Sequence, residues 1–215
     1  MENKFIDKLK LYLRGDELPG MEAHVKMASD NRKRRGALMP PTDARPSAVL
    51  ILLSDFGEDD FSFPLIQRPM YDGVHGGQMA LPGGKRDPED PSLIVTALRE
   101  CYEEIGIEVR PTEVLGTLSD LYIPPSNMLV TPVIAYSNKR NEYTLDPVEV
   151  DEVIETTLGH LLNPETKKMS TIDVRGMRFN APSFDIDGKV VWGATAMILS
   201  EMLEIVEGIQ QLSDR

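Results

Sequence analysis

Two apolar stretches in the first third of the chain predict neighbouring strands. Residues 48–53 (AVLILL) are continuously apolar, and residues 62–67 follow after the acidic segment 55–60. Runs of this length bounded by acidic and turn-forming residues are typical of buried strands, so we expect a hairpin here. Further strands are predicted at residues 113–118 and 129–136, and a second hairpin at residues 183–191, turning on Asp187-Gly188.

Helical spacing dominates both ends of the chain. Phe5, Ile6, Leu9 and Leu13 predict an amphipathic helix within residues 3–13. Other helices are predicted near residues 21–29, 91–105, 157–163 and 193–210. The buried side of the last one should carry Ala196, Ile198, Leu199, Met202, Leu203 and Val206. Because strands and helices interleave without internal repeats, the predicted fold class is mixed α/β (α+β).

The character of the chain changes near residue 46. We expect residues 1–45 to form an N-terminal helical extension and linker, and residues 46–215 to form one domain. The basic run Arg32–Arg35 is either an anion-binding arm or a solvated loop, and the acidity of the chain favours the loop. The apolar face of the N-terminal helices needs cover, either from its own domain or from the second copy in a homodimer.

The formal net charge of −12 argues against binding to a nucleic-acid backbone, which requires a basic face. An acidic protein can still bind a phosphate-bearing small molecule through divalent cations. The single cysteine, Cys101, excludes an intrachain disulfide and a multi-thiolate metal site. We find neither the apolar core of a signal peptide nor a run long enough to span a bilayer, so we expect a cytoplasmic location and no membrane partner.

The predicted helix at 91–105 carries a cluster of carboxylates. At about 100° per residue, Glu100, Glu103 and Glu104 fall within roughly 100° of arc on one face. Adjacent carboxylates repel each other, and a hard cation such as Mg²⁺ relieves that repulsion. Taken alone, this pattern is more often a solvated helix face. The neighbouring sequence changes that balance.

Glycines precede the acidic helix. Pro82-Gly83-Gly84 lets the backbone approach a ligand closely and offer N–H groups to phosphate oxygens. Asp90 is predicted to cap the helix, and Arg99 to pair with Asp90 and so tie the loop to the helix. Gly106 is placed where a glycine ends a helix. This combination favours a metal-assisted phosphate site.

The residues of this segment match a known family. Gly84, Arg99, Glu100, Glu103, Glu104, Gly106 and Ile107 resemble the Nudix box. The resemblance implies a Nudix fold, in which a mixed sheet is sandwiched between helices, and metal-dependent cleavage of a pyrophosphate bond. The loop before Arg99 is one residue longer than in the general box, and Asp90 corresponds to its usual glutamate. With the sequence LPGGKRDPED, that loop resembles the coenzyme A pyrophosphatase branch.

The resemblance also implies roles for particular residues. Metal binding, by Mg²⁺ or Mn²⁺, falls to Glu100, Glu103, Glu104 and the carbonyl of Gly84. Substrate binding falls to Arg68, His75, Gln78, Gly83 and Gly84, although His75 is equally compatible with ordering its own loop. Structural support falls to Asp90, Arg99 and Gly106. The general base is Glu103 or Glu104, with Glu149 as a distal candidate on the loop 146–152 and Glu152 as a weaker alternative; that loop is equally compatible with a solvated turn.

Coenzyme A is the substrate that the resemblance favours, giving 4′-phosphopantetheine and adenosine 3′,5′-bisphosphate. Pro69, Gly73 and Leu81 depart from the motif associated with coenzyme A, so another nucleoside diphosphate derivative, such as ADP-ribose or a dinucleotide, stays open. A non-catalytic nucleotide-binding module is disfavoured because all the box glutamates are present. Trp192 is expected to pack on the last helix rather than to stack on adenine.

Overall fold

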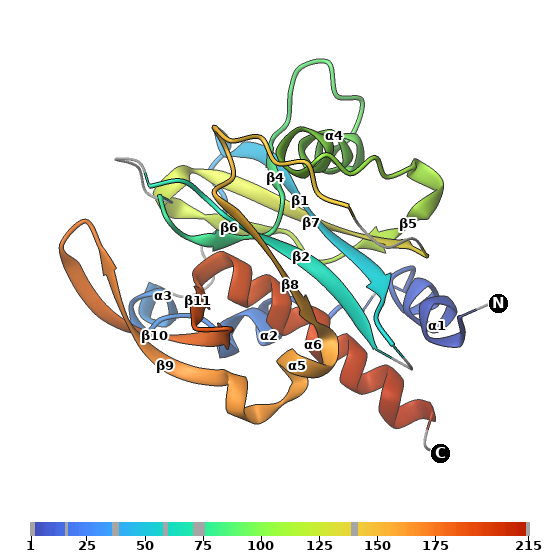
Figure 1. The fold of residues 1–215 in the computed structure, drawn as a ribbon. Coiled ribbons are helices and arrows are strands. Elements are labelled where there is room, and N and C mark those ends of the chain that lie inside the picture. The colour runs from blue at the N-terminus through green and yellow to red at the C-terminus, as the bar shows by residue number, and fades with distance from the viewer. Residues whose placement is uncertain are drawn as a thin grey trace.

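The computed structural model describes residues 3–15, 17–35, 39–57, 60–70, 76–138 and 142–213. A mixed sheet forms the centre, with helices on both faces (Figure 1). Its strands run in the order β3-β2-β1-β7-β5, while β4 pairs with β1, β6 with β7 and β8 with β2. Their bounds are β1 (Arg45–Asp55), β2 (Phe61–Gln67), β3 (Met79–Ala80), β4 (Gly83–Lys85), β5 (Val114–Thr117), β6 (Leu121–Ile123), β7 (Met128–Ser137) and β8 (Glu152–Thr157).

Helices cover the sheet, and a second sheet of three strands extends the fold. The helices are α1 (Lys4–Tyr12), α2 (Gly20–Lys26), α3 (Asp30–Arg35), α4 (Leu93–Ile105), α5 (Leu158–Leu162) and α6 (Gly193–Ser213). The second sheet contains β9 (Lys167–Val174), β10 (Met177–Ile186) and β11 (Lys189–Trp192). Short 3-10 helices cover Pro111–Glu113, Pro124–Ser126 and Pro164–Thr166. The predicted mixed α/β class is confirmed.

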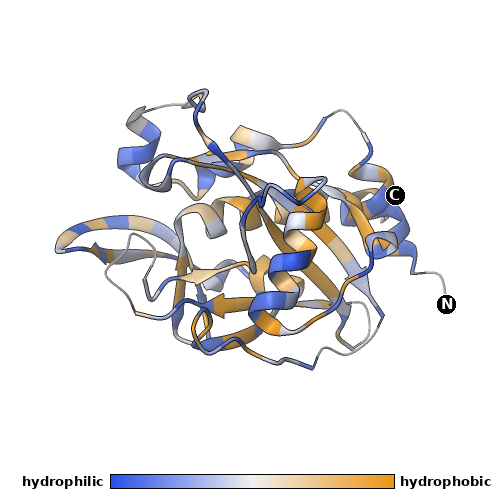
Figure 2. Cartoon of the chain, turned by 90° about the horizontal axis from the view of Figure 1, so that it is seen from above, coloured by the Kyte–Doolittle hydropathy of each residue, from blue (hydrophilic) through white to orange (hydrophobic). Residues whose placement is uncertain are grey.

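Strand β1 is buried on both faces. Leu50 and Leu52 pack in the cluster that includes α4, whereas Ile51 and Leu53 pack in the cluster that includes α6. Successive side chains of a strand point to opposite faces, so a strand between two helical layers needs an unbroken apolar run. Its parallel partner β7 runs alongside it from Met128 to Ser137. Figure 2 shows hydrophobic residues gathered on the sheet and on the inner sides of the helices.

The predicted hairpins are both present. β1 and β2 pair antiparallel with Ser54 opposite Ser62. β10 and β11 turn at Asp187-Gly188, where both residues have positive φ and the Gly188 N–H donates to Asp185 Oδ1. Strands β8 and β9 were not predicted from the sequence. Both carry many exposed polar or charged positions, so their apolar alternation is weak.

The N-terminal helices pack on the rest of the chain. Ile6 and Leu9 of α1 are buried in the same cluster as α6, and α2 lies along α6. Between α2 and α6, His24 Nε2 lies 2.8 Å from Glu201 Oε2, and both side chains are buried. The apolar face is therefore covered within the chain. The boundary near residue 46 and the homodimer stay predictions.

The loop predicted for the basic run was wrong, because residues 30–35 form α3. Ser29 begins this helical segment: its side chain accepts from the Arg32 N–H, and its carbonyl accepts from the Lys33 N–H at 2.9 Å. The Arg32 guanidinium donates to the Tyr122 carbonyl at 2.7 Å, which ties α3 to β6. Within the described residues, no helix combines the length and apolar character needed to cross a membrane.

Glu201→Leu is expected to lower the free energy of unfolding by about 3 kcal/mol, because it leaves buried partners unpaired. Glu201 Oε1 also accepts from the backbone N–H groups of Gly20 and Ser119. Lys26→Ala removes the ion pair between the exposed Lys26 and the partly buried Glu204 on the same two helices and should cost less than the loss of the fully buried pair. Urea unfolding of both variants measures the difference. Equal losses would contradict a stabilising role for the buried pair.

Candidate active site

Helix α4 begins two residues later than predicted. Its N-cap is Ser92, whose Oγ accepts from the Val95 N–H, so the assignment of Asp90 as N-cap was wrong. The Asp90 carboxylate is paired with Arg99 instead. At the other end Gly106 adopts a left-handed conformation with φ of 74°, as predicted for a glycine stop. A side chain at Gly106 would also collide with Thr144.

Asp90 and Arg99 fasten the preceding loop to α4, as predicted. Arg99 Nε and Nη2 lie 3.2 and 3.0 Å from the two carboxylate oxygens of Asp90. The Asp87 N–H and the Thr96 hydroxyl also donate to Asp90 Oδ2. Hydrogen bonding from Arg99 is the main cause that lowers the pKa of Asp90 to about 2, and burial opposes it. Asp90 therefore stays ionised and holds Arg99 in one orientation.

Arg99 in turn contacts the acidic face of the helix. Its Nη2 lies 3.0 Å from Glu100 Oε1 and 3.1 Å from the Lys85 carbonyl oxygen. Its Nη1 lies 2.7 Å from Glu103 Oε2. One guanidinium thus links the glycine loop, the cap region and two of the box glutamates.

The glycines of the loop are required by close packing. Gly83 has φ of 148°, and a β-carbon there would overlap the backbone of Ala48 and Val49. A β-carbon on Gly84 would instead overlap the carboxylate of Glu100. The Gly83 N–H donates to Glu104 Oε2 at 2.8 Å, so it supports a carboxylate of the site rather than pointing freely at a phosphate.

Three carboxylates converge beside this loop. Oxygen atoms of Glu100, Glu104 and Glu149 all lie within 4.8 Å of one another. Glu104 is almost fully buried, with an exposed side-chain fraction of 1%. Arg68 donates to the Gly83 carbonyl at 2.9 Å and lies 3.4 Å from Glu104 Oε1. The group therefore joins α4, the end of β2 and the loop before β8.

The loop that carries Glu149 is held by the C-terminal end of α4. The Thr144 N–H donates to the Ile105 carbonyl at 2.9 Å, and the Asp146 N–H to the Glu104 carbonyl at 3.0 Å. The last carbonyls of a helix have no intrahelical partners, so the loop satisfies groups that would otherwise need water. These backbone contacts place Glu149 beside Glu104, although Glu149 lies 45 residues further along the chain.

Burial raises the pKa of two of these carboxylates, Glu104 and Glu100. Burial is the main cause that raises the pKa of Glu104 to about 7, Arg68 and the Gly83 N–H oppose it, and Glu100 and Glu149 add to it. The pKa of Glu100 is also raised, chiefly by burial, against the effect of Arg99. Like charges held this close favour a cation, and an all-oxygen donor set suits Mg²⁺ or Mn²⁺. The residues present therefore fit a divalent metal.

The other predicted residues differ in position. Glu103 lies outside the group of three, with 53% of its side chain exposed. Glu152, the weaker candidate for the base, lies 2.7 Å from Lys189 Nζ. The Gln78 carbonyl accepts from the Arg68 N–H at 3.1 Å, and Gln78 lines a neighbouring pocket. The assignment of His75 to substrate binding lies outside the described residues.

The contacts of Arg68 with Glu104 and Gly83 were not predicted from the sequence. Arg68 follows a predicted strand and precedes a glycine-rich loop, which indicates a site residue but does not specify these partners. Cys101 is buried against the sheet, and burial, with a further effect of Glu104, raises its pKa to about 12. Its thiol therefore stays protonated, as expected for a packing residue.

Substitution of the two glycines should separate folding from metal binding. Gly83→Ala is expected to lower the free energy of unfolding by about 2–4 kcal/mol, because the overlap is with backbone atoms and φ is strained. Gly84→Ala should cost less than about 1 kcal/mol, since only the end of the Glu100 side chain must move. It should nevertheless weaken Mn²⁺ binding, measured by titration calorimetry. Mn²⁺ binding unchanged in a folded Gly84→Ala protein would contradict a role for Glu100 in holding the metal.

Comparison with known proteins identifies the family. The NUDIX domain family model matches residues 44–170. NudL of Photorhabdus laumondii, described as an uncharacterized Nudix hydrolase, is 30% identical over 182 residues, covering 85% of this chain and 89% of that protein. The mouse mitochondrial coenzyme A diphosphatase NUDT8 is 36% identical over 137 residues, covering 62% of this chain and 65% of the mouse protein.

A solved structure agrees in fold. The MutT/nudix family protein from Enterococcus faecalis matches 100% of this chain and 76% of its own, with a TM-score of 0.50 and 14% identity. That similarity concerns the fold alone. The family match spans the central sheet, the glycine loop and α4, and it confirms the resemblance found in the box residues. The chain belongs to the Nudix hydrolases, and the converging carboxylates of Glu100, Glu104 and Glu149 lie within its Nudix domain.

Proposed function

We propose that this Nudix hydrolase cleaves the pyrophosphate bond of coenzyme A, releasing 4′-phosphopantetheine and adenosine 3′,5′-bisphosphate. The observation that carries the reaction type is the convergence of Glu100, Glu104 and Glu149 beside the Gly83-Gly84 loop. Support for the substrate comes from the longer loop before Arg99 and from similarity to the mouse and human proteins named coenzyme A diphosphatase. ADP-ribose or a dinucleotide is the alternative substrate.

The metal would be held by Glu100 and Glu104, with Glu103 of the same helix and the Gly84 carbonyl of the preceding loop as further ligands. When bound, Mg²⁺ or Mn²⁺ would neutralise the negative charge of the diphosphate and lower the pKa of a bound water molecule. The neighbouring residues of the chain hold the carboxylate ligands in position. Gly83 and Arg68 hold Glu104 from two directions, and Arg99 holds Glu100 and Glu103.

For the general base we propose Glu149. Among the three converging carboxylates it is the exposed one, so a water molecule has access to it. Glu104 is buried and hydrogen-bonded, which suits it to a fixed position, and Glu103 is paired with Arg99. A carboxylate that accepts the proton of the attacking water must be free to approach that water.

A cytoplasmic location and a homodimer stay predictions from the sequence.

A panel of diphosphates tests the function directly. With Mg²⁺ or Mn²⁺, the purified protein is expected to release adenosine 3′,5′-bisphosphate from coenzyme A, followed by chromatography. Coenzyme A, ADP-ribose and a diadenosine polyphosphate are compared at equal concentration. Turnover of ADP-ribose without turnover of coenzyme A would exclude the proposed substrate. Absence of any turnover while nucleotides still bind would exclude the catalytic function.

The two exposed glutamates can be separated by kinetics. Glu149→Gln is expected to lower kcat by about 10²–10⁴-fold, the usual contribution of a general base. Glu103→Gln is expected to lower kcat less, because Glu103 lies outside the converging group. Both side chains are exposed, so thermal unfolding should change little. A larger loss of kcat in Glu103→Gln would assign the base to Glu103 instead.

A further inference from the structure

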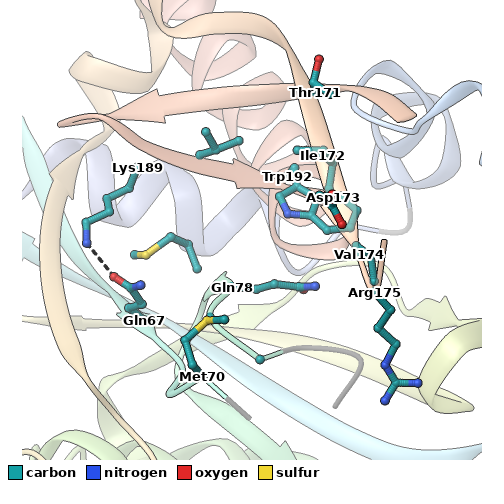
Figure 3. A pocket seen from close by; sticks show the side chains of 14 residues that line it. Gln67, Met70, Gln78, Thr171, Ile172, Asp173, Val174, Arg175, Lys189 and Trp192 are labelled. Carbon is teal, nitrogen blue, oxygen red and sulfur yellow. Dashed lines mark hydrogen bonds between the residues drawn. The ribbon is translucent and has the colours of Figure 1, made fainter. Parts of the chain in front are cut away.

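A pocket of about 490 Å³ lies between the end of β2 and the second sheet (Figure 3). One wall comes from the first sheet and includes Gln67, Gln78 and Met79. The facing wall comes from β9 and β11 and includes Ile172, Val190 and Trp192. A pocket of this size suits a small molecule or one arm of a larger one. Nothing in the proposed cleavage uses it.

The pocket and the carboxylate cluster share the end of β2. Gln67 and Gln78 line the pocket, and Arg68 lies between them: it follows Gln67 in the chain, and its N–H donates to the Gln78 carbonyl. The Arg68 side chain reaches Gly83 and Glu104 on the side of the carboxylates. Adjacent side chains at a strand end point to opposite faces. A substrate whose diphosphate lies at the carboxylates can therefore reach the pocket by crossing one strand end.

Ionic groups that line the pocket have partners inside the protein. Lys189 Nζ lies 2.6 Å from Gln67 Oε1 and 2.7 Å from Glu152 Oε2. Asp173 Oδ2 accepts from Arg178 Nε at 3.1 Å, and Asp173 Oδ1 accepts from the Gly176 N–H at 2.9 Å. The Arg175 side chain extends away from Trp192 (Figure 3). The charges of Lys189 and Asp173 are thus offset before a ligand arrives.

Apolar and aromatic side chains line the pocket beside the neutral polar side chains of Gln67, Gln78 and Thr171. Met79 and Ile172 are buried, Val190 is 40% exposed, and the Trp192 ring lies edge-to-face with Phe179, with ring centroids 5.7 Å apart. Methionine and tryptophan side chains provide a large contact area without requiring charge in the ligand. A phosphomonoester carries nearly two negative charges, so a site that binds it favours an unpaired cationic side chain. An uncharged chain with amide groups can bind without such a cation.

We propose that this pocket binds the uncharged arm of the substrate, which is the pantetheine chain if the proposed function holds. The proposal rests on that function for the identity of the arm. Trp192 and Val190 form the apolar wall, and Lys189 closes one side by joining β11 to Gln67 and to Glu152 of β8. The adenosine arm then lies on the side of the carboxylates, outside this pocket.

Tryptophan fluorescence tests the assignment, because Trp192 is the only tryptophan of the chain. Titration of the full-length protein with pantetheine is expected to change the emission of Trp192 saturably. Adenosine 3′,5′-bisphosphate at the same concentrations should leave it unchanged. A saturable response to adenosine 3′,5′-bisphosphate alone, or to neither compound, would overturn the proposal.

Two variants of Val190 test the charge preference without depending on turnover. Val190→Glu and Val190→Lys should both weaken pantetheine binding by about tenfold, since either places a charge in the apolar wall. An anionic arm would instead bind more tightly to the Val190→Lys protein, and that result would overturn the proposal. Met177→Glu and Met177→Lys are the matched controls. Met177 is an exposed residue of the same sheet that does not line the pocket, so binding should be unchanged.

Steady-state kinetics separates this proposal from the proposed function. If wild-type protein cleaves coenzyme A, both Val190 variants should raise KM by about tenfold with a smaller change in kcat, because the pocket binds an arm that does not react. Coenzyme A cleavage with KM unchanged in both variants would reject the pocket and leave the function standing. Pantetheine binding to a protein that does not cleave coenzyme A would reject the function alone.

Discussion

The buried carboxylate of Glu104 is the constraint around which the site is organised. A buried carboxylate is tolerated only where donors and cations compensate for the loss of water. Here the Gly83 N–H and the Arg68 guanidinium supply part of that compensation. The same two contacts bring the glycine loop and the end of β2 against α4. A divalent cation at the converging carboxylates would supply the rest.

Several contacts hold the carboxylate-bearing face of α4 in place. The opposite face of α4 packs against β1, whose apolar run is buried on both sides. Asp90 holds Arg99, and Arg99 orients Glu100 and Glu103. The loop after β7 donates backbone hydrogen bonds to the last carbonyl oxygens of α4, and these bonds place Glu149 beside Glu104. Rigid support of this kind lets like charges remain close together without unfolding the loop.

The second sheet provides one wall of the pocket, and the residues of the Nudix box do not line it. Its hairpin is joined to the first sheet by Lys189, which contacts both Gln67 and Glu152. This connection places a pocket with an apolar wall of Val190 and Trp192 next to Gln67, the residue before Arg68. Cleavage and recognition would then occupy two sides of a single strand end, with the chemistry set by α4 and the choice of substrate by the hairpin.

The sequence by itself determined the elements whose signals are local. The apolar run of β1, the acidic arc of α4, the glycine stop at Gly106 and the turn at Asp187-Gly188 all depend on neighbouring residues, and each is present. The pairing of Arg99 with Asp90 also spans only one loop. The N-cap was misplaced by two residues because Asp90 and Ser92 are both good caps, and the hydrogen bond from the Val95 N–H to Ser92 Oγ identifies Ser92 as the cap.

Tertiary structure decided everything that joins distant segments. Periodicity placed Glu103 on the acidic face, but the fold brought Glu149, rather than Glu103, to Glu100 and Glu104. It also covered the N-terminal helices with α6 and set Trp192 opposite Gln78 across a pocket. Side-chain spacing along a helix or strand specifies a face, whereas the partner of that face depends on chain crossings that no local pattern encodes.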